Sequence, residues 1–142
     1  IGNKAKTYID NGKLVPDEVL LGIINNCLKK QNVQDGYLLD GFPRTIPQAE
    51  GLKVIMQNLS QTLHSAISLI ADEDELVQRL INRGLRSGRS DDTPDVIRQR
   101  QKIYWNQTAP LLEYYNKRNL LKEVDAVGDI PEITKRILKV LR

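Results

Sequence analysis

Cysteine is nearly absent from this sequence: Cys27 is the only one among 142 residues. A single cysteine excludes an internal disulfide framework and any zinc site built from several cysteines. Long apolar runs are also absent, so no segment is long enough to cross a bilayer, and no signal-peptide pattern opens the sequence. We therefore expect a cytoplasmic protein in a reducing compartment, with no role in a membrane.

Neither sign of charge is in large excess. The sequence has 21 Lys and Arg against 18 Asp and Glu, which gives a net charge of +3. So small an excess argues against nucleic acid as a partner. The hydrophobic share of 40% and the charged share of 27% are typical of a folded globular domain. Composition therefore predicts an ordinary globular protein and leaves its function open.

Short apolar runs alternate with amphipathic segments along the sequence. The apolar runs predict buried strands at 37–39, 65–71 and 121–127. Helices are expected at 16–28, at 45–59, from 72 to a stop at Gly84, from 93 with an interruption at Pro110, and from 129 onward. This alternation predicts an α/β fold with a parallel sheet, whose ligands bind beyond the carboxyl ends of the strands.

The segment after the first predicted strand carries the strongest signal for a function. Asp40 stands where nucleotide enzymes hold magnesium, directly or through water, and Gly41 permits a sharp turn beside a ligand. Arg44 offers a planar fork of donors suited to a phosphate. Gln48 carries an amide that can donate and accept, as the edge of adenine requires. An Asp-Gly pair alone is most often a plain turn, but the complete string favours a nucleotide site.

Several stretches, in order along the sequence, resemble the adenylate kinase family. The first is the string Tyr37-Leu38-Leu39-Asp40-Gly41-Phe42-Pro43-Arg44 followed by Gln48. The others are Gly12-Lys13-Leu14-Val15-Pro16, which resembles the stretch that lines the AMP base, and Arg83-Gly84 with Ser87-Gly88-Arg89-Ser90-Asp91-Asp92, which resembles the short lid. Ile97, Arg100, Tyr104 and Pro110 continue the likeness, which therefore covers nearly all of the sequence.

The resemblance implies both a fold and an activity. The fold is a P-loop kinase-like parallel sheet with flanking helices, in which 1–15 is the remnant of the AMP-binding region, 16–82 and 93–142 form the core, and 83–92 is the short lid. The activity is reversible phosphoryl transfer from MgATP to AMP, giving two ADP. Its partners are ATP, AMP and ADP, its cofactor is Mg²⁺, no zinc is needed, and the protein is expected to be a monomer.

The resemblance also assigns roles to individual residues. The implied catalytic residues are Arg44, Arg83, Arg89 and Arg100. The implied AMP-binding residues are Lys13, Leu14, Val15, Gly41, Phe42, Pro43, Arg44, Gln48, Arg89 and Arg100. Arg83 and Gly128 correspond to positions that contact ATP, and Asp40 to the acid that orders the magnesium shell through water.

One family element is missing from the sequence. The P-loop pattern G-x-x-x-x-G-K occurs nowhere in these residues. From the expected distance between that motif and Gly12, we expect roughly fifty residues to be absent at the front, including the P-loop strand. Two alternatives stay open. One is a UMP/CMP-type kinase, although those carry Asn at the positions of Thr45 and Gln48. The other is a non-catalytic nucleotide-binding fragment or paralogue.

Overall fold

The computed structural model describes residue 8 and residues 15–30, 35–87 and 93–142. In order, the elements are α2 (Asp17–Leu28), α3 (Ile46–Asn58), β1 (Ala66–Ile70), α4 (Glu73–Ser87), α5 (Pro94–Ile103), the π-helix η3 (Tyr104–Thr108), α6 (Pro110–Asn116), β2 (Leu121–Asp125) and α7 (Ile130–Val140). Within these described ranges, every helix is too short or too polar to cross a membrane.

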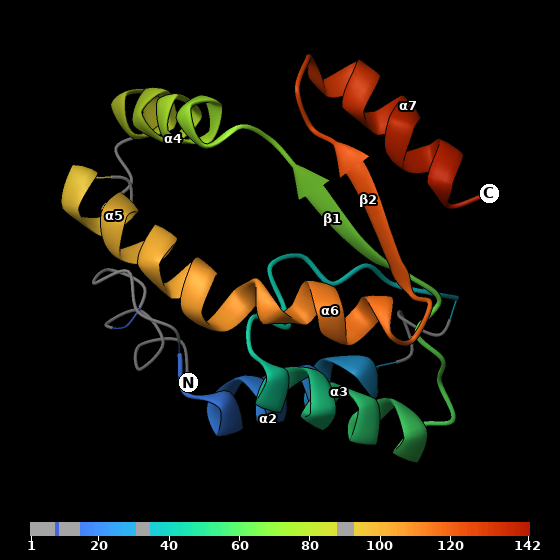
Figure 1. Ribbon diagram of the computed structural model, residues 1–142. Helices are drawn as coiled ribbons and strands as arrows, with labels where there is room; N and C mark the ends of the chain where they lie inside the picture. Colours follow the sequence, from blue (N-terminus) through green and yellow to red (C-terminus); the bar gives the residue numbers. More distant parts are fainter. Residues whose placement is uncertain (1–7, 9–14, 31–34, 88–92) are drawn as a thin grey trace.

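The two strands form a small parallel sheet. Ala66 lies opposite Leu121, and Ile70 lies opposite Asp125. The chain between the strands makes a long crossover through α4, α5, η3 and α6, as parallel pairing requires. In Figure 1 the last three of these form one bent rod that separates the sheet from α2 and α3, while α7 lies beside β2. The predicted α/β class with a parallel sheet is confirmed.

Helix α3 contributes to both of the apolar clusters that hold the helices together. On one side, Leu52 and Met56 pack with Leu28 of α2. On the other, Ala49 packs with Leu111 and Tyr115 of α6. Helix α3 is therefore the element that joins α2 to the helical rod.

The expected strand at 37–39 is wrong, because these residues form no strand. Leu38 is 75% exposed, whereas its neighbours Tyr37 and Leu39 pack against the cluster of α2 and α3. A strand is defined by its ladder of hydrogen bonds, and in the described residues β1 and β2 pair only with each other. The apolar run is thus buried on one side by helices instead of on both sides by a sheet.

Helix α4 also differs from expectation, because it passes through Gly84 and ends at Ser87. Glycine lowers helix stability by only about 1 kcal/mol relative to alanine, so a helix can continue through it. The predicted interruption at Pro110 is confirmed. Pro110 has no N–H to donate, and before it the helix widens so that the Ala109 N–H donates to the carbonyl of Tyr104, five residues back.

Gly51 of α3 lies against the side chain of Leu21 of α2. A Cβ at this position would lie 2.5 Å from Cδ1 and 3.2 Å from Cγ of Leu21. We expect Gly51→Ala to lower the free energy of unfolding by about 1 kcal/mol, because an overpacking cost of ~1–3 kcal/mol exceeds the gain of ~1 kcal/mol in helix propensity. Urea titration of the purified protein measures this change.

Gly22 provides the matched control for this substitution. It also lies inside a helix, but a Cβ there would have nothing within 4 Å. Gly22→Ala should therefore stabilise the protein by about 0.5–1 kcal/mol. If both substitutions stabilise equally, the close packing of α2 on α3 at Gly51 is wrong.

Candidate functional site

The loop from Asp40 to Arg44 is folded back on itself. Gly41 has a φ of +68°, and Nε of Arg44 donates to the carbonyl of Gly41 at 2.7 Å. A Cβ on residue 41 would lie 2.9 Å from Nη2 of Arg44, so the turn and the packing of the guanidinium both favour glycine here. Asp40 and Arg44 are exposed, whereas Phe42 and Pro43, joined by a cis peptide bond, are half-buried. The loop therefore presents a carboxylate and a guanidinium at the surface.

Gln48, which the sequence assigns to adenine, is wholly buried and hydrogen-bonded at both ends of its amide. Its Oε1 accepts from the backbone N–H of Arg44 at 2.7 Å, and its Nε2 donates to Oδ1 of Asp17 at 2.7 Å. The backbone N–H of Gln48 donates to the Thr45 hydroxyl at 3.2 Å, so Thr45 caps α3. The amide thus ties α2 to the loop that carries Arg44.

Asp17→Ala tests the importance of this tie. Without the carboxylate, the buried Nε2 of Gln48 loses its acceptor, which should lower the free energy of unfolding by about 1–3 kcal/mol. Glu18→Ala is the matched control, because Glu18 is the other acidic residue in the first turn of α2 but is exposed. Removing it should change stability by only about 0.3–1 kcal/mol, the usual effect of a charge at a helix end. Equal losses in the two variants would contradict the buried tie.

The π-helix brings a third contact to the same loop. The hydroxyl of Thr108 in η3 donates to the backbone carbonyl of Arg44 at 2.9 Å. The peptide groups on both sides of Arg44 are therefore fixed, one by Gln48 from α3 and one by Thr108 from the helical rod. This arrangement holds the Cα of Arg44 in place while its side chain stays at the surface.

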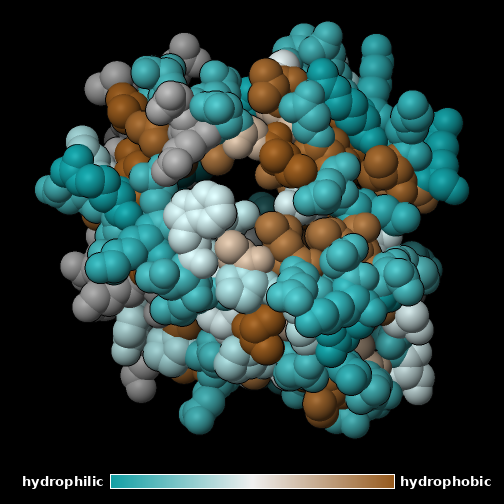
Figure 2. Space-filling view, viewed as in Figure 1, coloured by the Kyte–Doolittle hydropathy of each residue, from teal (hydrophilic) through white to brown (hydrophobic). Residues whose placement is uncertain are grey.

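Two more predicted site residues lie on helices that contact each other. Arg83 is exposed on α4, and Arg100 is half-buried on α5. Figure 2 shows the surface hollowed between these two helices, beside the carboxyl end of β1, which is where ligands bind in parallel sheets. Val15 is buried two residues before the start of α2. The predicted residues Lys13, Leu14 and Arg89 lie outside the described residues.

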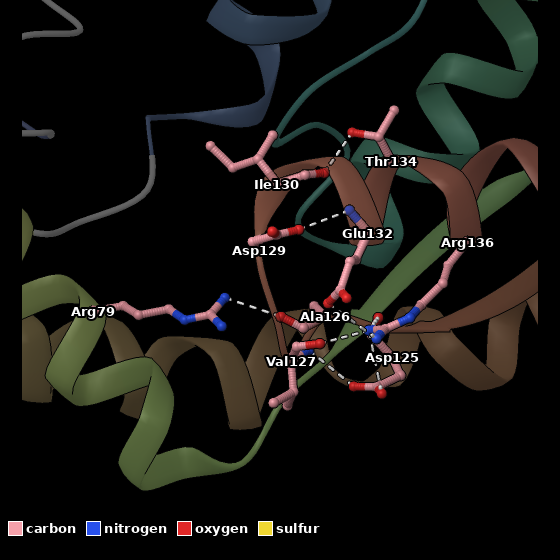
Figure 3. Close-up of polar contacts among 9 residues, drawn as sticks. All are labelled: Arg79, Asp125, Ala126, Val127, Asp129, Ile130, Glu132, Thr134 and Arg136. Carbon is pink, nitrogen blue, oxygen red and sulfur yellow. Dashed lines mark hydrogen bonds and ion pairs between the residues drawn. The ribbon is translucent and has the colours of Figure 1, made fainter.

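The loop between β2 and α7 carries the last predicted residue, Gly128. Gly128 is exposed, has a φ of +123°, and lies directly before Asp129, whose side chain accepts from the Glu132 N–H and caps α7. Figure 3 shows two arginines that reach this loop from opposite sides, Arg79 from α4 and Arg136 from α7. The loop is therefore held by both neighbouring helices.

Sequence reasoning missed four residues that shape these loops: Asp17, Arg79, Thr108 and Arg136. Three of them donate to backbone carbonyls. Every residue carries a backbone carbonyl, so no sequence motif marks the acceptor. Asp17 is an ordinary acidic residue at a helix start, and its partner Gln48 is 31 residues away. No local pattern could have identified these contacts.

Comparison with known proteins agrees with these motifs. The family model for adenylate kinase matches residues 1–120. The adenylate kinase of Nocardioides sp. is 44% identical over 141 residues, covering 99% of this chain and 74% of the relative. That of Thermobifida fusca is 42% identical, covering the whole chain and 75% of the relative, and that of Leptospira biflexa is 41% identical, covering 98% and 75%. This chain belongs to the adenylate kinase family.

Proposed function

We propose that this chain forms the AMP-binding side and part of the catalytic surface of an adenylate kinase, which transfers a phosphoryl group reversibly from MgATP to AMP and gives two ADP. The match to the family over residues 1–120 carries the proposal. Support comes from the exposed Arg44 on its fixed loop and from the hollow between α4 and α5. The UMP/CMP alternative is not favoured, because the relatives are adenylate kinases and Thr45 and Gln48 are both present.

Phosphoryl transfer depends mainly on positioning and charge neutralisation. Arg44, Arg89 and Arg100 would bind the phosphate of AMP and the transferring group, and Arg83 would bind the phosphates of ATP. Guanidinium groups suit this task because each donates to two phosphate oxygens at fixed angles. Backbone groups of Lys13, Leu14 and Val15, with Gly41, Phe42 and Pro43, would complete the AMP site. The amide of Gln48 would meet adenine only by exchanging its present bonds to Asp17 and to the Arg44 N–H.

Asp40 is the residue that would hold magnesium. Mg²⁺ keeps several waters and needs only one or two carboxylates when substrate phosphates supply the other ligands, so an exposed carboxylate fits it. No group of three or more His, Cys, Asp or Glu gathers in the described part of the chain, so a site made from protein ligands alone is not built there. When bound, Mg²⁺ neutralises charge on the phosphates.

The reaction also needs a P-loop, which residues 1–142 do not contain. The proposal therefore includes a P-loop segment from outside these residues. The tests below use a P-loop-bearing protein. This is the complete translation product or, if that product has no P-loop, residues 1–142 fused behind a segment that carries the G-x-x-x-x-G-K pattern. The proposal further includes a monomer in the cytoplasm, where the free thiol of Cys27 stays reduced.

A coupled assay of the P-loop-bearing protein tests the proposal. With ATP and Mg²⁺, we expect ADP to form rapidly with AMP and at least ~100-fold more slowly with UMP or CMP, since a site built for one base leaves polar groups unpaired with another. Omitting AMP measures the background. If UMP or CMP replaces AMP with equal efficiency, the assignment to AMP is wrong. If no nucleotide is phosphorylated, the enzymatic proposal is wrong.

A further inference from the structure

Arginine side chains donate hydrogen bonds to three successive carbonyl groups of the loop between β2 and α7. Nη1 of Arg136 donates to the carbonyls of Asp125 at 3.0 Å and Val127 at 2.5 Å. Between these two, the carbonyl of Ala126 accepts from Nη1 of Arg79 at 3.0 Å. In Figure 3 the guanidinium of Arg136 approaches from α7 and that of Arg79 from α4, with the loop between them. Two arginines from different helices therefore hold the loop through its backbone.

Carboxylates fix both the loop and Arg136. Asp125 accepts the N–H of Val127 at 2.9 Å through Oδ1, while its Oδ2 lies 3.4 Å from Nη1 of Arg136. Glu132, one helical turn before Arg136, lies 3.9 Å from the same guanidinium. Arg136 keeps 38% of its side chain exposed. Nη1 of Arg136 thus contacts the Asp125 carboxylate and the carbonyls of Asp125 and Val127 at the same time.

Residues Gly128 and Asp129, at the tip of the loop, remain available for a ligand. Among the described residues, the backbone N–H groups of Gly128 and Asp129 have no hydrogen-bond partner, and both residues are exposed. A side chain at residue 128 would meet Oε2 of Glu132 at 2.7 Å, and φ is +123°, so only glycine suits this shape. The carbonyls of residues 125–127 are thus hydrogen-bonded within the chain, whereas the N–H groups of Gly128 and Asp129 are available to a ligand.

We propose that Arg136 is a positioning residue for the donor nucleotide: it shapes the loop so that Gly128 presents its peptide group to the base of ATP. The inference rests on the proposed function, in which Gly128 contacts ATP. Arg136 itself touches no substrate. Because the base is recognised far from the phosphates, Arg136 affects the binding of ATP and its distinction from other triphosphates, and it leaves AMP binding unchanged.

The test is steady-state kinetics of Arg136→Gln in the P-loop-bearing protein. We expect KM for ATP to rise about tenfold, the factor that corresponds to one hydrogen bond of a charged group, while KM for AMP and kcat stay within about twofold. UTP has the same phosphates but a different base, so its kcat/KM should hardly change. The ATP preference over UTP should therefore fall about tenfold. The KM for ATP of Arg136→Lys should lie between those of the unsubstituted protein and of Arg136→Gln, because an ammonium cannot donate in a fixed fork.

Lys135→Gln is the matched control, since it removes the same charge from the neighbouring position of α7. Lys135 is exposed, and its side chain makes no hydrogen bond or ion pair within the described ranges, so its removal should leave all these constants unchanged. An Arg136→Gln variant with normal KM for ATP and normal preference over UTP would overturn the inference. Equal losses with ATP, UTP and AMP would also overturn it, because they indicate general damage. An unsubstituted protein that forms no ADP would overturn the proposed function, and this inference with it.

Discussion

Arg89→Ala should lower kcat of the P-loop-bearing protein about a thousandfold and leave its thermal stability nearly unchanged. Arg89 belongs to a stretch of almost entirely polar residues, Ser87-Gly88-Arg89-Ser90-Asp91-Asp92, so we expect its loss to cost little packing. In the proposed reaction its guanidinium neutralises charge that develops on the transferring phosphoryl group. An arginine in this role typically changes the rate by about 10³–10⁵.

Two further variants separate this role from a general effect of charge. Arg89→Lys keeps the positive charge but loses the fork of donors, so its rate should lie between those of the wild type and Arg89→Ala. Arg98→Ala removes an exposed arginine that pairs with Asp95, three residues before it on α5, and should leave kcat within about twofold. Near-normal turnover of Arg89→Ala would show that Arg89 is not catalytic.

Local sequence signals predicted the elements that depend on local chemistry. Thr45 caps α3 and Asp129 caps α7, because each places a side-chain oxygen beside a free N–H of the first turn. Pro110 interrupts the long helix because it has no N–H. The apolar runs at 65–71 and 121–127 contain β1 and β2, where they pair with each other. Caps, prolines and apolar runs act over a few residues and can be read directly.

The errors arose where long-range contacts decide the structure. Leu38 looked like the centre of a buried strand, yet burial of a strand depends on neighbours that its own sequence cannot show. Gly84 looked like a helix stop, although a glycine ends a helix only when the chain beyond it turns away.

The same limit applies to the site. The motif identified Gln48 as a functional amide, and the structure adds that Asp17 and the Arg44 N–H occupy its two ends. Arg136 belongs to none of the motifs, and its carbonyl partners in the preceding loop follow from the path of the backbone. Motifs thus indicated candidate ligand-binding residues, while the residues that position them required coordinates.

Residues 1–142 alone should have no measurable phosphotransferase activity, whereas we expect the P-loop-bearing protein to be active. The β- and γ-phosphates of ATP need a cradle of backbone N–H groups and a lysine, and no G-x-x-x-x-G-K segment occurs in these residues. Lys13 follows a glycine, but no second glycine stands five positions before Gly12. The arginines can still attract nucleotides, but without the cradle the two reacting phosphates are not aligned, and alignment supplies about 7–11 kcal/mol of the barrier reduction.

The coupled assay for ADP formation from ATP and AMP measures this loss with two matched proteins. The P-loop-bearing protein is the positive control. The same protein with its P-loop lysine replaced by alanine defines the background, because it keeps every residue of this chain and loses only one phosphate contact of the cradle. We expect residues 1–142 to fall at or below that background, since they lack the whole cradle. Turnover clearly above it would mean that residues 1–142 align the phosphates by themselves, and that the requirement for a P-loop is wrong.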